Sequence, residues 1–293
     1  MLGTIKKIKF NTMASSDFPT FNMILDCSFN DDNGEVPSYL NREGVMTENH
    51  NGTYQSVYQY KYNERFSPKI TFLKEGFTDF EDKEVRAVLK WLTSKSTPSY
   101  AYFYEDIYSE IAKFCALGGW TNIQLHKISN SRVVGITAVF EATTPYAFSD
   151  IHTYKRTITG PTTFTVTCDN DDTAYVYPRV TIKQKSGTEV IITNTITTPE
   201  TDLFTGVTVN KTRVFTTAVR NNQVDETVII DGANKLIYSE TYPNRTFGTD
   251  FGTHDIHNQW VWLPLVDGEN IITVTGNCEL TLEYREVRKI GEY

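Results

Sequence analysis

The side chains best suited to binding a metal lie in one short stretch of the C-terminal half. Asp250, His254, Asp255 and His257 bring two imidazoles and two carboxylates close together in the sequence. Zinc and similar ions take such nitrogen and oxygen ligands. The stretch is rich in Gly and Asn, however, and in turns of that composition such residues usually face solvent. The sequence therefore predicts no metal and no cofactor, with His254, Asp255 and His257 as weak candidates.

The motifs of common enzymes are missing from the sequence. It contains no Gly-rich phosphate loop, no GxSxG nucleophile elbow and no HExxH zinc motif. The enzyme alternative is a glycosidase or depolymerase that uses a pair of carboxylates. Asp and Glu are abundant, but nothing marks one pair as special, so we do not expect an enzyme.

The cysteines form neither a metal-binding nor a disulfide pattern. Cys27, Cys115, Cys168 and Cys278 are scattered, without CxxC or Cys/His ligand spacing. A free cysteine is usually a small buried apolar side chain. We expect four buried, reduced thiols.

Three aromatic side chains could stack on a sugar ring: Trp260, Trp262 and Tyr242. Trp260 and Trp262 alternate along one predicted strand, so both face either the core or an outer groove. Burial statistics favour the core. Aromatic rings exposed beside polar groups are typical of sugar sites. The alternative function is therefore a carbohydrate-binding adhesion module that recognises glycans on the host surface.

The composition is that of a folded, acidic protein. The chain has 293 residues, of which 39% are apolar and 13% aromatic, and a formal net charge of −8. It has no basic stripe that would bind a phosphate backbone and no apolar run long enough to span a membrane. The N-terminus lacks the apolar stretch of a signal peptide. We expect no specific nucleic-acid binding, no membrane insertion and synthesis in the cytoplasm.

Strand patterns dominate the N-terminal half and predict a sheet. The predicted strands are 18–25, 54–66, 69–73, 100–104, 123–128 and 133–140. The Asn- and Asp-rich segment 30–34 predicts an exposed hairpin tip. The segment 107–116 fits either a short helix or a strand.

One helix is predicted in this half. Val85, Val88, Leu89 and Leu92 repeat at the spacing of a helix face. Thr78 and Glu81 match a capping box, and Pro98 disfavours helical geometry just before it, so the helix is expected to end near residue 95. Its apolar face must pack against the sheet.

Helical periodicity disappears beyond about residue 150, where short strands rich in β-branched residues follow one another. The predicted strands are 164–167, 179–183, 189–193, 207–209, 213–215, 227–230, 235–238, 260–264, 270–274 and 279–284. We therefore predict two domains. Residues 1–149 form a β-rich domain with one helix, and residues 150–293 form an antiparallel β-sandwich or jelly roll.

Several motifs, taken in order, resemble those of siphophage distal tail proteins. In the first half they are Arg86, Trp91-Leu92, SYAYF at 99–103, VFE at 139–141 and TPYA at 144–147. In the second half they are LPLVDGEN at 263–270, IITV at 271–274 and LTLEYR at 280–285. The resemblance spans nearly the whole chain.

This resemblance implies a structural virion protein of the phage tail tip. In that family an N-terminal ring-forming hub domain is followed by a C-terminal galectin-like β-sandwich. Copies form a hexameric ring that joins the tail tube to the baseplate and spike and leaves a central DNA channel. The implied partners are further copies of the chain, the tail tube protein, a tail-associated spike or lysin and, in some phages, receptor-binding proteins. The protein would be assembled in the cytoplasm of the bacterial host.

Two segments are candidate assembly contacts, because interfaces gather at exposed loops and aromatic stretches. The first is the predicted hairpin tip with Asp31, Asp32 and Asn33. The second is the segment 104–113, with Tyr104 and Tyr108.

Overall fold

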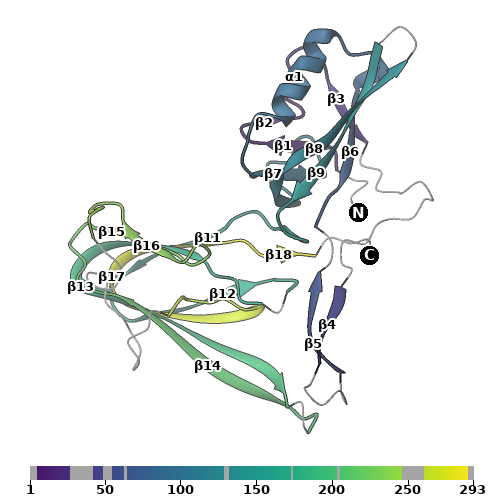
Figure 1. Cartoon of the computed structure of the whole chain (residues 1–293). Coiled ribbons are helices and arrows are strands. Elements are labelled where there is room, and N and C mark those ends of the chain that lie inside the picture. Colours follow the sequence, from purple (N-terminus) through teal and green to yellow (C-terminus); the bar gives the residue numbers. More distant parts are fainter. Residues whose placement is uncertain are drawn as a thin grey trace. The chain divides into compact units, whose positions relative to one another are not determined.

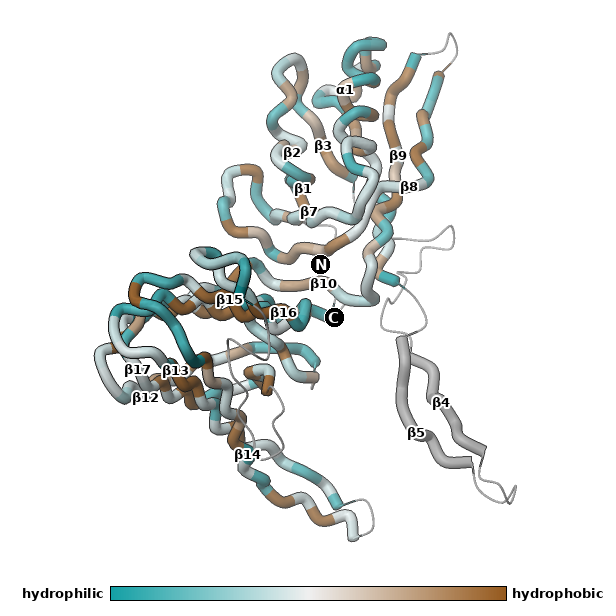
Figure 2. Tube along the Cα trace, turned by 60° about the vertical axis from the view of Figure 1, so that its left-hand side comes forward, coloured by the Kyte–Doolittle hydropathy of each residue, from teal (hydrophilic) through white to brown (hydrophobic). Residues whose placement is uncertain are grey.

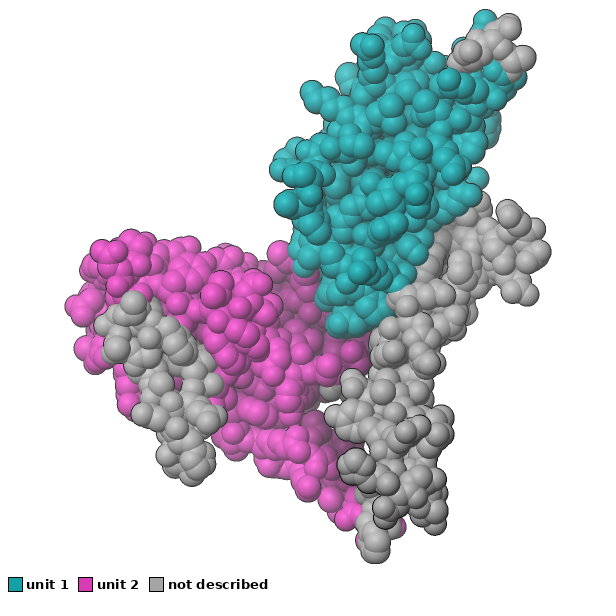
Figure 3. Space-filling view, in the orientation of Figure 1, with its two compact units in different colours: residues 1–150, 287–293 teal, residues 151–286 magenta. Residues whose placement is uncertain are grey.

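The chain folds into two compact units in a computed structural model that describes residues 5–26, 42–48, 55–62, 65–128, 132–172, 174–202, 205–245 and 261–289. One unit comprises residues 1–150 and 287–293, and the other comprises residues 151–286 (Figure 3). The last residues belong to the first unit because the short strand β18 pairs with β10, which precedes residue 150. The predicted second domain, 150–293, differs from this second unit in that residues 287–293 belong to the first unit.

The described part of the first unit contains a nine-stranded antiparallel sheet. Its central path runs β2-β1-β7-β8-β9-β6-β3, and β10 pairs with both β8 and β18. The strands are β1 (Lys7–Phe10), β2 (Met13–Ala14), β3 (Met23–Asp26), β6 (Lys69–Lys74), β7 (Ser99–Tyr104), β8 (Phe114–Ile128), β9 (Arg132–Ala142), β10 (Ala147–Phe148) and β18 (Val287–Arg288). A short 3-10 helix, η2 (Glu75–Phe77), follows β6. Two further strands, β4 (Arg42–Glu48) and β5 (Gln55–Tyr62), pair with each other as a separate two-stranded sheet.

The predicted helix is α1 (Asp82–Leu92), the one α-helix among the described residues. Its capping box lies one turn later than the predicted Thr78–Glu81 pair. Glu81 is the N-cap, and the carboxylate of Glu84 accepts the backbone N–H of Glu81 at 2.8 Å. The predicted pair was wrong because Glu84 is held at this position by Lys74 at the end of β6, an interaction that helix-cap patterns alone do not reveal. The helix ends at Leu92, earlier than predicted.

Helix α1 lies against the sheet of the first unit (Figure 1), and aromatic rings join the two. Trp91 of the helix packs edge-on against Phe72 of β6, with ring centroids 5.7 Å apart. Trp120 of β8 contacts Phe72, Phe140 and Trp91 at centroid separations of 5.5, 5.2 and 6.4 Å. Edge-to-face pairs of this kind add specificity to the large area that each ring buries. The helix is thereby fixed in one position on the sheet.

The described part of the second unit is an antiparallel β-sandwich whose two layers share long strands. Its strands are β11 (His152–Ile158), β12 (Thr162–Cys168), β13 (Arg179–Thr201), β14 (Thr208–Val219), β15 (Thr227–Asp231), β16 (Leu236–Ser239) and β17 (Gly268–Tyr284). The first half of β13 pairs with β15 and with the end of β17. Its second half pairs with β14 and with the start of β17. The mainly β fold class predicted from the sequence is confirmed, and the galectin likeness stays a prediction.

Both long strands bend between the layers without losing their alternation. Val180, Ile182, Val190 and Ile192 of β13 are all buried in one core, although the pairing with β17 is irregular between residues 184 and 191. Brown segments of the tube mark this apolar interior along β13 and β17 (Figure 2). The sequence predicted two short strands in place of each long one, because the bends carry polar residues and glycines.

Gly276 is the position where β17 can bend. Its φ is +138°, and a Cβ there would lie 2.9 Å from the carbonyl oxygen of Glu189 and 3.1 Å from Cγ2 of Val190. Only glycine adopts this conformation without strain, and no side chain fits so close to a neighbouring backbone.

Asn270, the last residue of the LPLVDGEN motif, has a structural role. It is fully buried, and its Oδ1 accepts the N–H of Val266 at 2.9 Å and the side-chain amide of Asn194 at 3.0 Å. Its own Nδ2 donates to the carbonyl oxygen of Val266 at 2.9 Å. These bonds fix the segment that leads into β17, so the motif is part of the packing of the sandwich.

Beyond the sandwich core, β13 and β14 continue as an exposed hairpin. Facing threonines bond across it, with Oγ1 atoms 3.0 Å apart for Thr197 and Thr212 and 2.8 Å apart for Thr201 and Thr208. Glu200 pairs with Lys211 at 2.8 Å and also with Arg213. Such cross-strand pairs stabilise a hairpin where no core is available.

Replacing Gly276 with Ala tests the bend. We expect Gly276→Ala to lower the free energy of unfolding by at least about 1 kcal/mol, because the added Cβ meets backbone at a positive φ. Gly160→Ala is the matched control, since no atom lies within 4 Å of its Cβ position, and it should change stability by less than about 0.5 kcal/mol. Urea unfolding of both variants would measure this, and equal effects would contradict the role of Gly276.

Candidate functional site

The candidate residues divide between described and undescribed parts of the chain. The metal candidates His254, Asp255 and His257, the aromatic Trp260, and the tip residues Asp31, Asp32 and Asn33 lie outside the described residues. Tyr104, Tyr108, Trp262 and Tyr242 lie within them. In the described ranges no cluster of His, Cys, Asp and Glu has the composition of a metal site. No helix in those ranges combines the length and apolarity needed to cross a bilayer.

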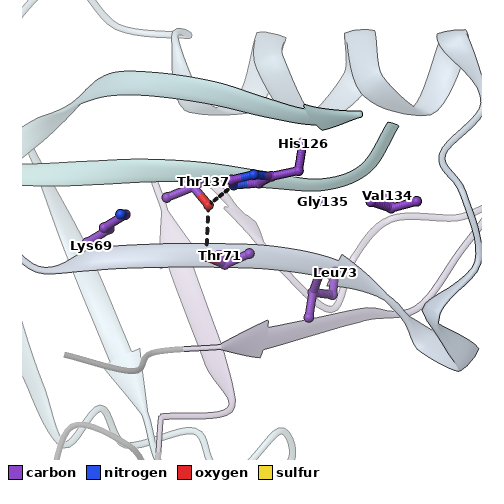
Figure 4. Close-up of a pocket in the computed structure, with 7 residues that line it drawn as sticks. All are labelled: Lys69, Thr71, Leu73, His126, Val134, Gly135 and Thr137. Atoms are coloured by element: carbon purple, nitrogen blue, oxygen red, sulfur yellow. Dashed lines mark hydrogen bonds between the residues drawn. The ribbon is translucent and has the colours of Figure 1, made fainter. Parts of the chain in front are cut away.

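A polar groove of about 330 Å³ lies on the sheet of the first unit, on the face opposite α1 (Figure 4). Lys69, Thr71 and Leu73 of β6, His126 of β8 and Val134, Gly135 and Thr137 of β9 line it. The Nε2 atom of His126 lies 2.6 Å from Oγ1 of Thr137, which in turn lies 2.8 Å from Oγ1 of Thr71. Thr137 is only 2% exposed, so its hydroxyl is held between the two partners.

The groove has an imidazole and hydroxyls but lacks the rest of a catalytic triad. Nucleophilic catalysis by a hydroxyl needs a base that a third group orients, usually a carboxylate. None of the residues that line the groove is a carboxylate. The chain of His126, Thr137 and Thr71 is best explained as a cross-strand hydrogen-bond ladder that satisfies a buried hydroxyl.

The segment after β7 is an ordered loop, Glu105–Lys113, which we call the β7–β8 loop. It is neither helix nor strand. Because β8 begins at Phe114, the strand alternative holds only for the last three residues of the segment 107–116. Lys7 donates through Nζ to the carbonyl oxygens of Ile107 and Ser109, both at 2.7 Å. Asp106 accepts the N–H of Tyr108 at 2.9 Å, and Glu105 pairs with Lys113.

This loop presents apolar side chains to solvent. Tyr108 is 85% exposed, Ile111 is 76% exposed and Ile107 is 44% exposed. Tyr104, at the base of the loop, is instead buried, with Nζ of Lys7 4.4 Å from its ring centroid. Burial raises the pKa of the Tyr104 hydroxyl. Tyr104 therefore supports the loop from below, and Tyr108 is the residue available to a partner.

The aromatic residues of the second unit are arranged around a lysine. Nζ of Lys235 lies 3.1 Å from the ring centroid of Tyr177 and 5.3 Å from that of Trp262. Trp262 packs partly against the core, whereas Tyr242 is exposed. Burial lowers the pKa of Lys235. A sugar stacking on Trp262 would have to compete with this cation–π contact, which weighs against Trp262 as a glycan platform.

The three described cysteines, Cys115, Cys168 and Cys278, are free and buried. Burial raises the pKa of the Cys278 thiol to about 11. Burial likewise raises the pKa of Tyr284, whose hydroxyl donates to the carbonyl oxygen of Thr167 at 2.8 Å. The Cys278 thiol is a packing residue and lacks the lowered pKa of a reactive cysteine.

Two family models match the chain one after the other. The model described as a phage tail protein N-terminal domain matches residues 4–144. The model described as a phage tail C-terminal domain matches residues 146–284. No curated protein matches the chain by sequence.

The fold resembles solved phage structures. The crystal structure of the SPP1 Dit protein, described as a paradigm of the hub adsorption apparatus in phages that infect Gram-positive bacteria, aligns with a TM-score of 0.58 and 12% identity. The alignment covers 97% of this chain and 99% of that one. A chain of the phage P2 baseplate in its activated conformation with Ca aligns with a TM-score of 0.48 and 9% identity, covering 98% and 99% of the two chains.

The raised pKa of Cys278 predicts a pH dependence of stability. In the unfolded chain the thiol loses its proton near its ordinary value of 9.0, whereas the folded protein holds it until about pH 11. The folded state thus binds more protons between these values, and the free energy of unfolding should fall as pH rises from about 9 to about 11. Urea unfolding of Cys278→Ala across this range should show a shallower fall than the parent chain. An unchanged slope would contradict the assignment.

Proposed function

Because the chain belongs to a family of phage tail proteins whose N- and C-terminal domains it carries in order, we propose that it is a distal tail protein of a siphophage or phage-like particle. The observation that carries the proposal is the likeness of the fold to the SPP1 Dit hub protein along 97% of the chain. Family membership and fold together favour a structural role. We propose no catalytic activity, no cofactor and no metal.

The proposed assembly is a hexameric ring built by sheet edges and apolar patches. In the described part of the first unit, the sheet ends at β2 on one side and β3 on the other. Edge strands carry unpaired backbone N–H and C=O groups, and a closed ring of copies removes such edges. The exposed apolar side chains of the β7–β8 loop supply the kind of surface that interfaces bury.

The proposed location is the tip of the virion tail. The ring would join the tail tube to the baseplate and spike and leave a central channel for DNA. The net charge of −8 supports passage of DNA, since a basic channel would retain the phosphates. The neighbours would be the tail tube protein, a spike or lysin protein and, in some phages, receptor-binding proteins. The second unit would be the galectin-like domain, and assembly would take place in the cytoplasm of the host.

Ring formation by the purified full chain tests this function. We expect light scattering after size exclusion to give the mass of a hexamer, and negative-stain images to show rings with a central hole. The physical reason is that copies complete one another's sheet edges and cover the β7–β8 loop. Measuring the mass over a range of concentrations is the control, because a weak ring dissociates on dilution. A strict monomer at high concentration, without rings in the images, would contradict the proposal.

A further inference from the structure

A pocket of about 320 Å³ lies in the first unit beside the C-terminal end of α1. It forms because β7 begins at Ser99, opposite Gly118, whereas β8 continues past that pair with no β7 residue beside it. Leu92 and Trp120 supply apolar surface to the pocket, Ser96 and Thr97 add hydroxyls, and Lys95 is its one charged lining residue.

Trp120, which lines the pocket, leaves one buried polar atom of the described core without a partner. Its side chain is 8% exposed, and its indole Nε1 has no hydrogen-bond partner within the described residues. The neighbouring Trp91 is satisfied, since its Nε1 donates to the carbonyl oxygens of Phe10 at 3.3 Å and Met13 at 3.1 Å. Buried donors are rarely left without an acceptor, and each one calls for an explanation.

The β7–β8 loop carries the complement of this pocket. Tyr108 has a flat apolar ring that ends in a hydroxyl, and a tyrosine loses little conformational freedom when it is buried. Asp106 and Glu110 on the same loop are acidic, whereas the pocket is lined by the basic Lys95. The loop follows the last residue of β7 and the pocket adjoins the first, so the two features lie at opposite ends of one strand of a single rigid unit.

We propose that Tyr108 of one copy of the chain inserts into the Leu92–Trp120 pocket of the next copy. This contact rests on the proposed ring, and it would be one of the interfaces between neighbouring copies. The Tyr108 ring covers Leu92 and Trp120, and its hydroxyl bonds with the hydroxyls of Ser96 and Thr97. Asp106 and Glu110 lie towards Lys95.

An interface of this kind can repeat around a ring. The two surfaces differ and occupy separate places on each copy, so the contact is heterologous, and every added copy leaves one free loop and one free pocket. Such a series closes when the rotation between neighbours divides a full turn. A second copy is favoured over another tail protein because both halves of the contact, with opposite charges, are present on this chain.

Removing the tyrosine tests the loop side. Tyr108→Ser should raise the dissociation constant of the ring at least about tenfold, as loss of a central aromatic anchor does at other interfaces. Phe77→Ser is the matched control, because Phe77 is also an exposed aromatic of the first unit, 73% exposed, but lies on η2. It should assemble as the parent chain does. Equal assembly of both variants and the parent would overturn the proposal.

Blocking the pocket and mixing two variants tests the pairing itself. Ser96→Trp places a large side chain in the pocket at an exposed position, so the unit should still fold, which thermal unfolding would verify. Alone, this variant and Tyr108→Ser should each assemble poorly. Mixed, they should form one-to-one pairs and no rings, since the intact loop of one meets the intact pocket of the other.

The outcomes separate this contact from the ring as a whole. If the parent chain forms no ring, the proposed function fails together with this contact. If the parent and Ser96→Trp both form rings of equal stability, the ring stands and the pocket does not receive the loop. If Tyr108→Ser fails to assemble but the mixture gives no pairs, Tyr108 contacts another surface, and the proposed pairing is wrong.

Discussion

The packing of Trp91 and Trp120 against Phe72 is the interaction on which the first unit depends. The packed rings fix α1 on the sheet. In addition, the indole N–H of Trp91 donates to backbone carbonyl oxygens of β1 and β2. Protein interiors pack as densely as crystals of small molecules, so an aromatic cluster of this size leaves few alternative positions. The end of α1, the start of β7 and the β7–β8 loop therefore keep constant distances from one another, as the proposed ring would require of its subunits.

The second unit achieves rigidity by a different route. Its layers are joined covalently, because β13 and β17 each run through both and contribute every second residue to one core. Within the buried interior, the side-chain amide of Asn194 donates to Asn270, which also accepts the N–H of Val266 and so fixes the segment leading into β17. A sandwich held in this way can carry the exposed β13–β14 hairpin, since the hairpin is the continuation of strands already anchored in the core.

Local patterns predicted the elements well where local forces decide them. The repeat of Val85, Val88 and Leu92 identified α1, and the β-rich second half was evident from its β-branched residues. The cap at Glu81 and Glu84 was missed because Lys74, which lies outside the helix on β6, helps to hold Glu84. The continuity of β17 was missed because Gly276 looks like a strand break, although it is the residue that allows the bend. The pocket beside Trp120 had no sequence signal, since its walls come from β1, the segment after α1 and β8.

The β7–β8 loop shows why an exposed apolar surface can be compatible with a stable subunit. Asp106 and Glu110 flank Tyr108 in the sequence, and their charges favour solubility of the exposed loop. Lys7 bonds the backbone of Ile107 and of Ser109, so the loop is ordered during folding and little conformational entropy remains to be lost on association. A loop whose only role was to connect β7 to β8 would need neither the ordering nor the exposed apolar side chains. Its combination of rigid backbone, apolar side chains and acidic residues is what the proposed contact between copies would require.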